Sequence, residues 1–283
     1  MKVLLAAVGT RGDVQPQLVL GEELARRGHN VRFAAPPNFR AAAETRGFSF
    51  VPVGEDINAF MRKNRAMTEQ NPLLALPGQI GLLRANTEQQ VRDLFSVQHD
   101  APHDADIVVS AGLCFAGKMV ADQLRVPHVF VCYTLSGMYS AEHPPAVLPI
   151  FGLPKLANRA LWAGITKTFD LALGGTLNRM RAELGIALER KHWRSIHTTQ
   201  VLLAQDQAMG VLPSDTPGKA VQIPALVPRP QDAQPLSDLL ERFLRGAGDG
   251  ATSAAPVVYL GFGSMPTVDR QRIVRIASEL FEV

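Results

Sequence analysis

Several familiar signatures are missing from these 283 residues, and each absence excludes a class of protein. The only cysteines, Cys114 and Cys132, form neither a C-x-x-C pair nor the spacing of a disulfide-rich secreted scaffold, so we expect two buried free thiols. The dinucleotide-binding fingerprint G-x-G-x-x-G and the P-loop pattern G-x-x-x-x-G-K-[ST] are also absent. NAD chemistry and ATP chemistry are therefore disfavoured.

A strong charge of either sign is missing as well. The 29 Lys and Arg residues exceed the 26 Asp and Glu residues by three, and the two signs are mixed along stretches such as residues 22–27. Such mixing is typical of solvated helix faces, so no nucleic-acid partner is expected. Trp193 lies among basic residues at 190–194, but one aromatic is weak evidence for a nucleic-acid or membrane patch, and we assign it to the surface. The spacing of His192 and His197 does not suit a zinc helix, and no metal site is expected.

Long hydrophobic runs are also missing. The apolar stretch at the N-terminus is broken by Gly9 and charged at Arg11, which makes it too short for a transmembrane helix and poor as the core of a signal peptide. We expect a cytoplasmic protein, and a peripheral membrane contact stays open. Hydrophobic residues nevertheless make up 46% of the chain, which is enough to build a core.

The remaining pattern alternates short apolar runs with amphipathic stretches. Continuously apolar runs that end at a turn residue indicate strands buried on both faces of a parallel sheet, and the amphipathic stretches between them indicate helices. The sequence therefore predicts a doubly wound α/β fold. The expected strands are 3–8, 31–35, 48–53, 107–111, 128–132 and 201–204, and the expected helices are 16–27, 39–46, 115–124 and most of 153–184, with 58–97 a broken helical excursion.

A change of composition divides the chain. Residues 227–256 are rich in Pro, Gly, Asp, Gln, Ala and Ser, with one short amphipathic helix at 236–244, and indicate a linker. The apolar run 257–265 then leads into a Gly-rich turn and a helical pattern at 268–281. We predict a domain at 1–226, a linker at 227–256, and the first β-α unit of a second domain at 257–283.

The loop that follows the first strand reads Gly9-Thr10-Arg11-Gly12-Asp13. A glycine-containing turn between a strand and a helix directs backbone N–H groups toward the carboxyl edge of the sheet, where α/β folds bind ligands and where phosphate is favoured. A carboxylate at this edge could act as a general base on an acceptor hydroxyl. An Asp just before a helix is also a preferred N-cap, and Arg11 could pair with a phosphate or with a surface carboxylate, so both alternatives stay open.

Three stretches carry a resemblance to a known family: GTRGDVQP at 9–16, APPNF at 35–39 and VVYLGFGSM at 257–265. In this order, separated by a linker, they resemble the family 1 glycosyltransferases of the two-domain GT-B type, in the manner of sterol glucosyltransferases and of bacterial enzymes that glycosylate glycopeptide aglycones. The resemblance implies two Rossmann-like domains, the first complete and the second only begun. It also implies an inverting transfer from a nucleotide-diphosphate sugar, of the UDP class, to a hydroxyl of a lipophilic acceptor, without a metal or other cofactor.

The resemblance also assigns roles to residues. It implies that Asp13 is the catalytic base, and no histidine lies between Met1 and Gly28 to take that role. Gly9, Thr10, Arg11 and Gly12 would face the donor diphosphate, with Ser264 hydrogen-bonding it from the second domain; a plain turn residue is the alternative for Ser264. By analogy the acceptor pocket would be lined at the edge of the sheet, with ordinary packing as the alternative for each residue, by Met61, Cys114, Phe115, Tyr133, Thr134, Tyr139 and His143.

The donor-recognition segment of that family, a Gly- and His-rich stretch late in the second domain, has no counterpart in this sequence. Three hypotheses follow for these 283 residues: an inactive fragment of a sugar transferase, a half-enzyme completed by a separate donor-binding subunit, or a non-enzymatic module that binds a lipophilic ligand.

Overall fold

The structure is a computed structural model. It describes residues 1–64, 72–96, 104–146, 148, 150–198, 200–229, 235–246, 259 and 270–281. The chain divides into two compact units, Met1–Leu226 and Val227–Val283, which are described separately.

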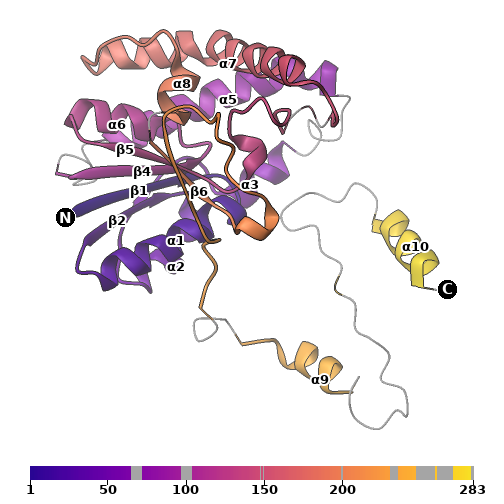
Figure 1. The fold of residues 1–283 in the computed structure, drawn as a ribbon. Coiled ribbons are helices and arrows are strands. Elements are labelled where there is room, and N and C mark those ends of the chain that lie inside the picture. Colours follow the sequence, from indigo (N-terminus) through magenta and orange to yellow (C-terminus); the bar gives the residue numbers. More distant parts are fainter. Residues whose placement is uncertain are drawn as a thin grey trace. The chain divides into compact units, whose positions relative to one another are not determined.

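The first unit is built on a seven-stranded sheet in which every pairing is parallel (Figure 1). The strand order is β3-β2-β1-β4-β5-β6-β7. The predicted α/β class with a parallel sheet is confirmed. The strands are β1 (Lys2–Val8), β2 (Asn30–Ala35), β3 (Ser49–Pro52), β4 (Ile107–Gly112), β5 (His128–Cys132), β6 (Gln200–Ala204) and β7 (Lys219–Ile223).

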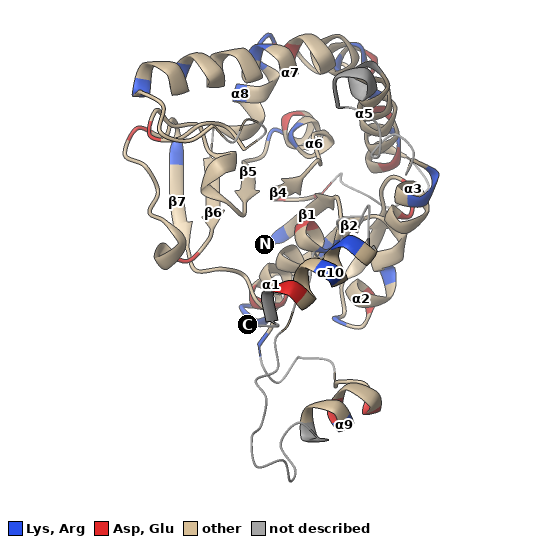
Figure 2. Cartoon of the chain, turned by 90° about the vertical axis from the view of Figure 1, so that its right-hand side faces the viewer, with Lys and Arg blue, Asp and Glu red and all other residues tan. Residues whose placement is uncertain are grey.

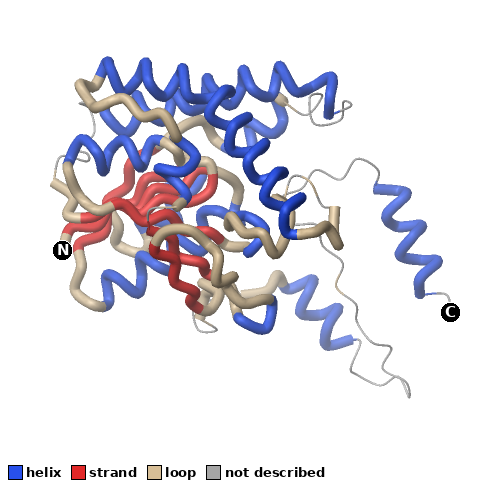
Figure 3. Tube along the Cα trace, turned by 45° about the horizontal axis from the view of Figure 1, so that its top comes forward, coloured by secondary structure: helices blue, strands red, loops and turns tan. Residues whose placement is uncertain are grey.

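Helices cover both faces of this sheet. Figure 1 shows α1 and α2 on one face and α5, α6, α7 and α8 on the other, and Figure 3 shows helices in blue on both sides of the red strands. In Figure 2 blue and red segments are interspersed over the outer helices, which agrees with the mixed charge of the sequence. The α-helices of this unit are α1 (Arg11–Arg26), α2 (Arg40–Glu44), α3 (Ile57–Lys63), α5 (Pro72–Phe95), α6 (Ala116–Leu124), α7 (Lys155–Glu183) and α8 (His192–His197), and the short 3-10 helices are η1 (Pro37–Phe39), η2 (Leu135–Gly137) and η3 (Gln207–Met209).

Strand β1 shows why the sheet is central. Its side chains alternate between two hydrophobic cores, with Leu4 in the core under α5, α6 and α7 and Leu5 in the core under α1 and α2. Both side chains are almost fully buried. A strand covered on both faces must be apolar at every position, which is the pattern of residues 3–8.

Three features differ from the sequence-based expectation. Helix α1 begins at Arg11 rather than Pro16, because Thr10 and Asp13 form a capping box that starts the helix five residues earlier. Helix α5 runs through the Pro77-Gly78 pair, which we had interpreted as a break. Edge strand β7 was not predicted: its Val221 is exposed, so the strand lacks the continuous apolar run that marks a buried one.

Two histidines pack on the α7 and α8 side of the sheet: His128, in β5, is buried, and His197, the last residue of α8, is half-buried. His128 shares a hydrogen bond with the buried Ser110 hydroxyl across β4 and β5 (2.8 Å). The ring of His197 packs against Phe130 and Trp193, with ring centroids 4.5 and 5.0 Å away. Burial lowers the pKa of His128 to about 3 and that of His197 to about 4, so both rings are neutral in the folded protein at pH 7.

These histidines predict loss of stability in acid. The unfolded chain protonates them near pH 6.5, so below that pH it binds more protons than the folded chain, and the free energy of unfolding falls as pH decreases. At pH 4.5 the two sites together should cost roughly 4–5 kcal/mol relative to pH 7, measured by urea denaturation. His128→Asn, which can still hydrogen-bond Ser110, should remove about half of this dependence; an unchanged pH dependence in that variant would contradict the assignment.

The second unit contains two described helices, α9 (Asp238–Gly246) and α10 (Arg270–Phe281). Helix α9 corresponds to the predicted amphipathic helix at 236–244, and α10 to the later part of the pattern at 268–281. The predicted strand and Gly-rich turn at 257–265 lie outside the described residues except for Tyr259, and so does Ser264.

Candidate active site at the carboxyl edge of the sheet

The candidate site lies where the strand order reverses. Strands β1 and β4 are neighbours, but the chain moves outward from β1 toward β3 and outward from β4 toward β7. In open α/β sheets such a switch point leaves a crevice beyond the carboxyl ends of the two strands. Here that edge is formed by Gly9 after β1 and by Gly112 and Leu113 at the end of β4, where Leu113 donates its N–H to the Val8 carbonyl (2.8 Å).

Asp13 projects from the first turn of α1 into this edge. Its Oδ2 accepts the N–H of Thr10 at 2.8 Å, which is one half of the capping box. Thr10 is therefore the N-cap, and Asp13 is the third residue of the helix rather than the residue before it. The capping function that we considered for Asp13 is present, but this hydrogen bond uses only one of its two carboxylate oxygens.

Two glycines make room for this carboxylate. A Cβ atom on Gly9 would lie 2.1 Å from Asp13 Oδ2, and a Cβ atom on Gly112 would lie 3.0 Å from Oδ1 and 2.5 Å from the Val8 carbonyl oxygen. Both glycines also have positive φ angles, +147° and +61°, which L side chains rarely adopt. The carboxylate is thus held between the ends of β1 and β4 by backbone that tolerates no side chain.

The surroundings tune the acidity of this group. Partial burial raises the pKa of Asp13 above its ordinary value, and the Thr10 N–H opposes the increase by stabilising the anion. A carboxylate that is partly desolvated holds a proton more readily than an exposed one. This property suits a general base that must accept a proton from an alcohol.

Tyr133 anchors the helix that carries Asp13. Its hydroxyl donates to the Asp13 backbone carbonyl at 3.0 Å, which ties the end of β5 to the first turn of α1. Burial raises the pKa of Tyr133, so the phenol stays protonated and remains a donor. Gln17, one turn further along α1, is fully buried. Tyr133 therefore supports the first turn of α1, and its half-buried ring packs against the core under α1 and α2.

An apolar cavity of about 240 Å³ opens beside Gly9. Its walls come from the ends of β1 and β4 and from α3 and α5. Met61, which we predicted to contact the acceptor, is in this wall together with Val8, Gly9, Ile57, Phe60, Asn64, Gln79, Leu82, Leu83, Asn86 and Leu113. The cavity combines a mostly apolar surface with a few amide groups, which is the composition expected for a lipophilic ligand that carries hydroxyls.

The other predicted phosphate-loop residues lie at the open side of α1. Arg11 and Gly12 are exposed in its first turn, and the Arg11 guanidinium donates to Gln15 at 2.5 Å. Thr10 is half-buried at the N-cap. Backbone N–H groups at this end of a 16-residue helix favour an anion.

Cys114 and Phe115 have a different environment from the one we predicted. They lie in the core under α5, α6 and α7, with exposed fractions of 0% and 4%, and neither lines the cavity beside Gly9. Burial raises the pKa of the Cys114 thiol to about 12, so it is unreactive. Cys132 is also buried, and both thiols are free as expected.

Three further predicted acceptor residues follow β5 and do not line the cavity beside Gly9 either. Thr134 is exposed, and its hydroxyl shares a hydrogen bond with Ser136. Tyr139 and His143 pack around Trp162, with ring centroids 5.6 and 6.2 Å from it, and the Trp162 indole N–H donates to the His143 carbonyl at 3.0 Å. They stabilise the loop that leads into α7.

Sequence reasoning missed most of the cavity wall. Phe60, Leu82 and Leu83 belong to the predicted helical excursion at 58–97, of which only Met61 was predicted by number, and Ile57 lies just before it. Their helical spacing was the available signal, but it does not show which side faces the edge of the sheet. Leu113 lies directly after β4, the strand that pairs with β1.

Two further observations concern the described part of the chain only. No group of three or more His, Cys, Asp or Glu side chains gathers there in a way that could hold a metal ion. No helix among those residues combines the length and the apolar character needed to cross a membrane.

Comparison with known proteins agrees with this architecture. Residues 3–133 match the glycosyltransferase family 28 N-terminal domain. Glycosyltransferase GtfE of Amycolatopsis orientalis is 32% identical over 278 residues, and the match covers 94% of this chain and 61% of GtfE. Vancomycin aglycone glucosyltransferase of the same organism is 28% identical, again covering 94% of this chain and 61% of the relative. Sterol 3-beta-glucosyltransferase UGT80B1 of Arabidopsis thaliana is 25% identical, and the match covers 99% of this chain and 45% of UGT80B1.

Solved structures support the fold. The match to the calicheamicin glycosyltransferase CalG4 covers 84% of this chain and 56% of the CalG4 chain, with a TM-score of 0.58 and 18% identity. The match to the glycosyltransferase of kitacinnamycin covers 84% of this chain and 55% of the other, with a TM-score of 0.55 and 15% identity. The chain thus spans between about half and three fifths of the length of these relatives. The matched N-terminal domain and the relatives that span nearly the whole chain make it similar in sequence to glycosyltransferases, and the solved structures show that it shares their fold.

Proposed function

We propose that this chain is the acceptor-binding part of an inverting glycosyltransferase. The enzyme moves a sugar from a nucleotide-diphosphate sugar, of the UDP class, to a hydroxyl of a lipophilic acceptor such as a sterol or a natural-product aglycone. One observation carries the proposal: the Asp13 carboxylate lies at the switch point of the sheet, where an apolar cavity opens beside Gly9. The names of the vancomycin aglycone and sterol glucosyltransferases support this class of acceptor.

In the proposed reaction Asp13 is the base. The acceptor lies in the apolar cavity with its hydroxyl toward Asp13, which takes the hydroxyl proton as the acceptor oxygen forms a bond to the anomeric carbon of the sugar. The bond from that carbon to the diphosphate oxygen breaks, and its electron pair leaves with the nucleoside diphosphate. Attack from the face opposite the leaving group inverts the anomeric configuration. No metal ion takes part in this proposal.

The donor occupies the open side of the loop at residues 9–12. Backbone N–H groups at the start of α1 and the exposed Arg11 would receive the diphosphate. We propose that Ser264 hydrogen-bonds it from the second domain. Because orientation of two substrates depends on both walls of a cleft, an effect of roughly 7–11 kcal/mol in well-oriented systems, we propose that these 283 residues need a complete donor-binding domain for turnover.

The test combines binding with transfer. The purified chain is titrated with hydrophobic alcohols, and then incubated with a panel of nucleotide sugars, alone and together with a donor-binding domain such as that of GtfE. Mass spectrometry should detect an acceptor that is heavier by one sugar unit only when the donor domain is present. Acceptor that binds but is never modified by any nucleotide sugar in either mixture would contradict the proposal and favour a binding module.

A substitution in the cavity wall separates acceptor binding from chemistry. Met61→Gln keeps the size of the side chain but places an amide in the apolar wall, and it should raise KM for a lipophilic acceptor roughly tenfold, since burying an unpaired amide costs about 1–3 kcal/mol. The value of kcat should change little. Met61→Leu, which stays apolar, is the matched control. Equal KM values in both variants would exclude Met61 from the acceptor site.

A further inference from the structure

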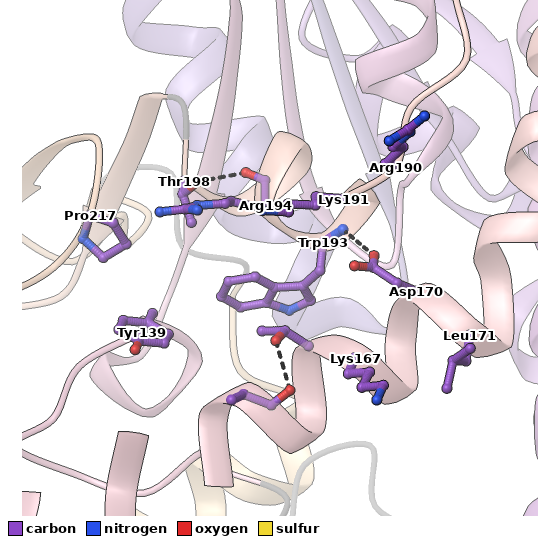
Figure 4. Close-up of a pocket in the computed structure, with 12 residues that line it drawn as sticks. Tyr139, Lys167, Asp170, Leu171, Arg190, Lys191, Trp193, Arg194, Thr198 and Pro217 are labelled. Carbon is purple, nitrogen blue, oxygen red and sulfur yellow. Dashed lines mark hydrogen bonds between the residues drawn. The ribbon is translucent and has the colours of Figure 1, made fainter. Parts of the chain in front are cut away.

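A second cavity lies in a different part of the first unit. It has a volume of about 640 Å³ and is bounded by α7, by the segment of residues 190–198 that includes α8, and by Tyr139 and Pro217 (Figure 4). It shares no lining residue with the apolar cavity beside Gly9. The proposed glycosyl transfer therefore makes no use of it.

The aromatic wall of this cavity is rigid. Figure 4 shows the indole of Trp193 in the middle of the lining residues, with Tyr139 and Pro217 to one side and Leu171 to the other. Trp193 is only 8% exposed, which corrects our assignment of this residue to the surface. It stacks on His197 and packs against Trp162, with ring centroids 5.0 and 5.8 Å away. A large aromatic side chain held on both sides is a preorganised contact surface for an apolar group.

The remaining lining is strongly cationic. Lys167, Arg190, Lys191 and Arg194 border the cavity, and all four are exposed. None of them forms a salt bridge with another described residue. This differs from the solvated helix faces elsewhere, such as residues 22–27, where the two signs pair with each other.

The nearby carboxylates are already engaged. Asp170, the one acidic residue in the lining, accepts the backbone N–H of Trp193 at 2.9 Å and so fixes the start of α8. Glu189 accepts the backbone N–H groups of Arg190 and Lys191 at 2.7 and 2.9 Å. The acidic groups therefore organise the backbone, and the cationic side chains are left to face the cavity and solvent.

We propose that this cavity binds an organic anion, namely a phosphate or carboxylate attached to an aromatic or aliphatic body. The body lies against Trp193 and Tyr139, and the anionic group is held among Lys191, Arg194 and their basic neighbours. Charge-assisted hydrogen bonds and desolvated apolar contact are both needed, so neither an inorganic anion nor a neutral aromatic compound fills the site well. The proposal does not depend on the transferase activity.

The two tryptophans of the chain, Trp162 and Trp193, provide a direct readout. In a ¹H–¹⁵N NMR spectrum their indole N–H groups give two resonances, which a Trp162→Phe variant assigns. Titration with 1-naphthyl phosphate should shift the Trp193 resonance in a saturable way. Inorganic phosphate and 1-naphthol, which each carry half of the recognised chemistry, should bind at least about tenfold more weakly.

Paired double variants test the cationic wall. Lys191→Ala with Arg194→Ala should weaken 1-naphthyl phosphate binding about tenfold or more, the effect expected for losing charge-assisted hydrogen bonds. Arg26→Ala with Arg27→Ala removes the same charge from exposed residues at the end of α1, on the other face of the sheet, and should leave the affinity unchanged.

Three results would overturn the proposal: equal affinity in the Lys191/Arg194 variant, an equal loss in both double variants, or binding that does not shift the Trp193 resonance. Co-sedimentation with phosphatidylglycerol vesicles without any binding of 1-naphthyl phosphate would also overturn it, because it would indicate adsorption of the basic surface to a membrane.

Discussion

Asp13→Asn is expected to lower kcat of the transferase about a hundredfold or more, the low end of what a general base contributes. Asparagine has nearly the same shape as aspartate but cannot accept the hydroxyl proton of the acceptor. The measurement is the initial rate of product formation by mass spectrometry, with the donor-binding domain present and both substrates saturating.

This substitution leaves the capping function intact. The side-chain oxygen of the introduced asparagine can still accept the Thr10 N–H that Asp13 Oδ2 accepts at 2.8 Å, so the start of α1 should be preserved. Thermal unfolding of the variant should stay close to that of the wild type, which separates catalysis from stability. Near-normal turnover in Asp13→Asn would mean that the carboxylate serves only to cap the helix.

Gly112→Ala is expected to have the second largest effect, because it acts on both the fold and the site. The new Cβ atom would lie 2.5 Å from the Val8 carbonyl oxygen and 3.0 Å from Asp13 Oδ1. Forcing an alanine into this left-handed conformation and relieving the clash should lower the free energy of unfolding by roughly 1–3 kcal/mol. Displacement of the carboxylate should also reduce turnover by a factor of ten or more, on the scale of about a hundredfold for a 1 Å misplacement.

Gly28→Ala is the matched control for this prediction. Gly28 also has a positive φ angle, +84°, but a Cβ atom there would meet nothing within 4 Å. The Gly28→Ala variant should lose stability through backbone strain alone, and its turnover should equal that of the wild type. Urea denaturation and initial rates of the two variants give the comparison, and equal turnover in both would show that Gly112 does not position Asp13.

Much of the fold could be predicted because buried strands require apolar residues, and these appear in the sequence as short apolar runs. The six strands that we predicted are buried on one or both faces, and short apolar runs such as 3–8 and 128–132 are typical of strands inside a sheet. Strand β7 could not be predicted in this way: it lies at the edge of the sheet, and Lys219 and Val221 are exposed. Residue preferences for β-strands differ between edge and central positions, so they identify an edge strand less well than a central one.

The candidate site, like the fold, could be predicted from the sequence only in part. The Gly9-to-Asp13 loop could be predicted because glycine, a helix start and a carboxylate are encoded in adjacent positions. Met61 was the one residue of the cavity wall predicted by number as an acceptor contact, and most of the other members come from separate segments that only the tertiary fold brings together. Cys114 and Phe115 were assigned to the acceptor by analogy, but both side chains are buried in the core, and a loop sequence does not encode which way its side chains turn.

The structure also shows that the two roles considered for Asp13, helix capping and catalysis, are compatible. Capping and catalysis were competing interpretations, yet the geometry accommodates both: one oxygen accepts the Thr10 N–H, while the carboxylate as a whole lies between two glycines at the edge of the sheet. The hydrogen bond fixes the orientation of the group, and partial burial raises its pKa. A structural role of this kind holds a base in one position before the substrate arrives.

The pH dependence of kcat/KM for sugar transfer tests the central claim most directly, since it reports the ionisation of the base in the free enzyme. We predict that the rate rises with pH through one acidic ionisation whose apparent pKa lies above the ordinary aspartate value of 3.8, and that it is level at higher pH. The residual activity of Asp13→Asn should lack this limb. A wild-type limb that persists unchanged in Asp13→Asn would contradict the assignment of Asp13 as the catalytic base.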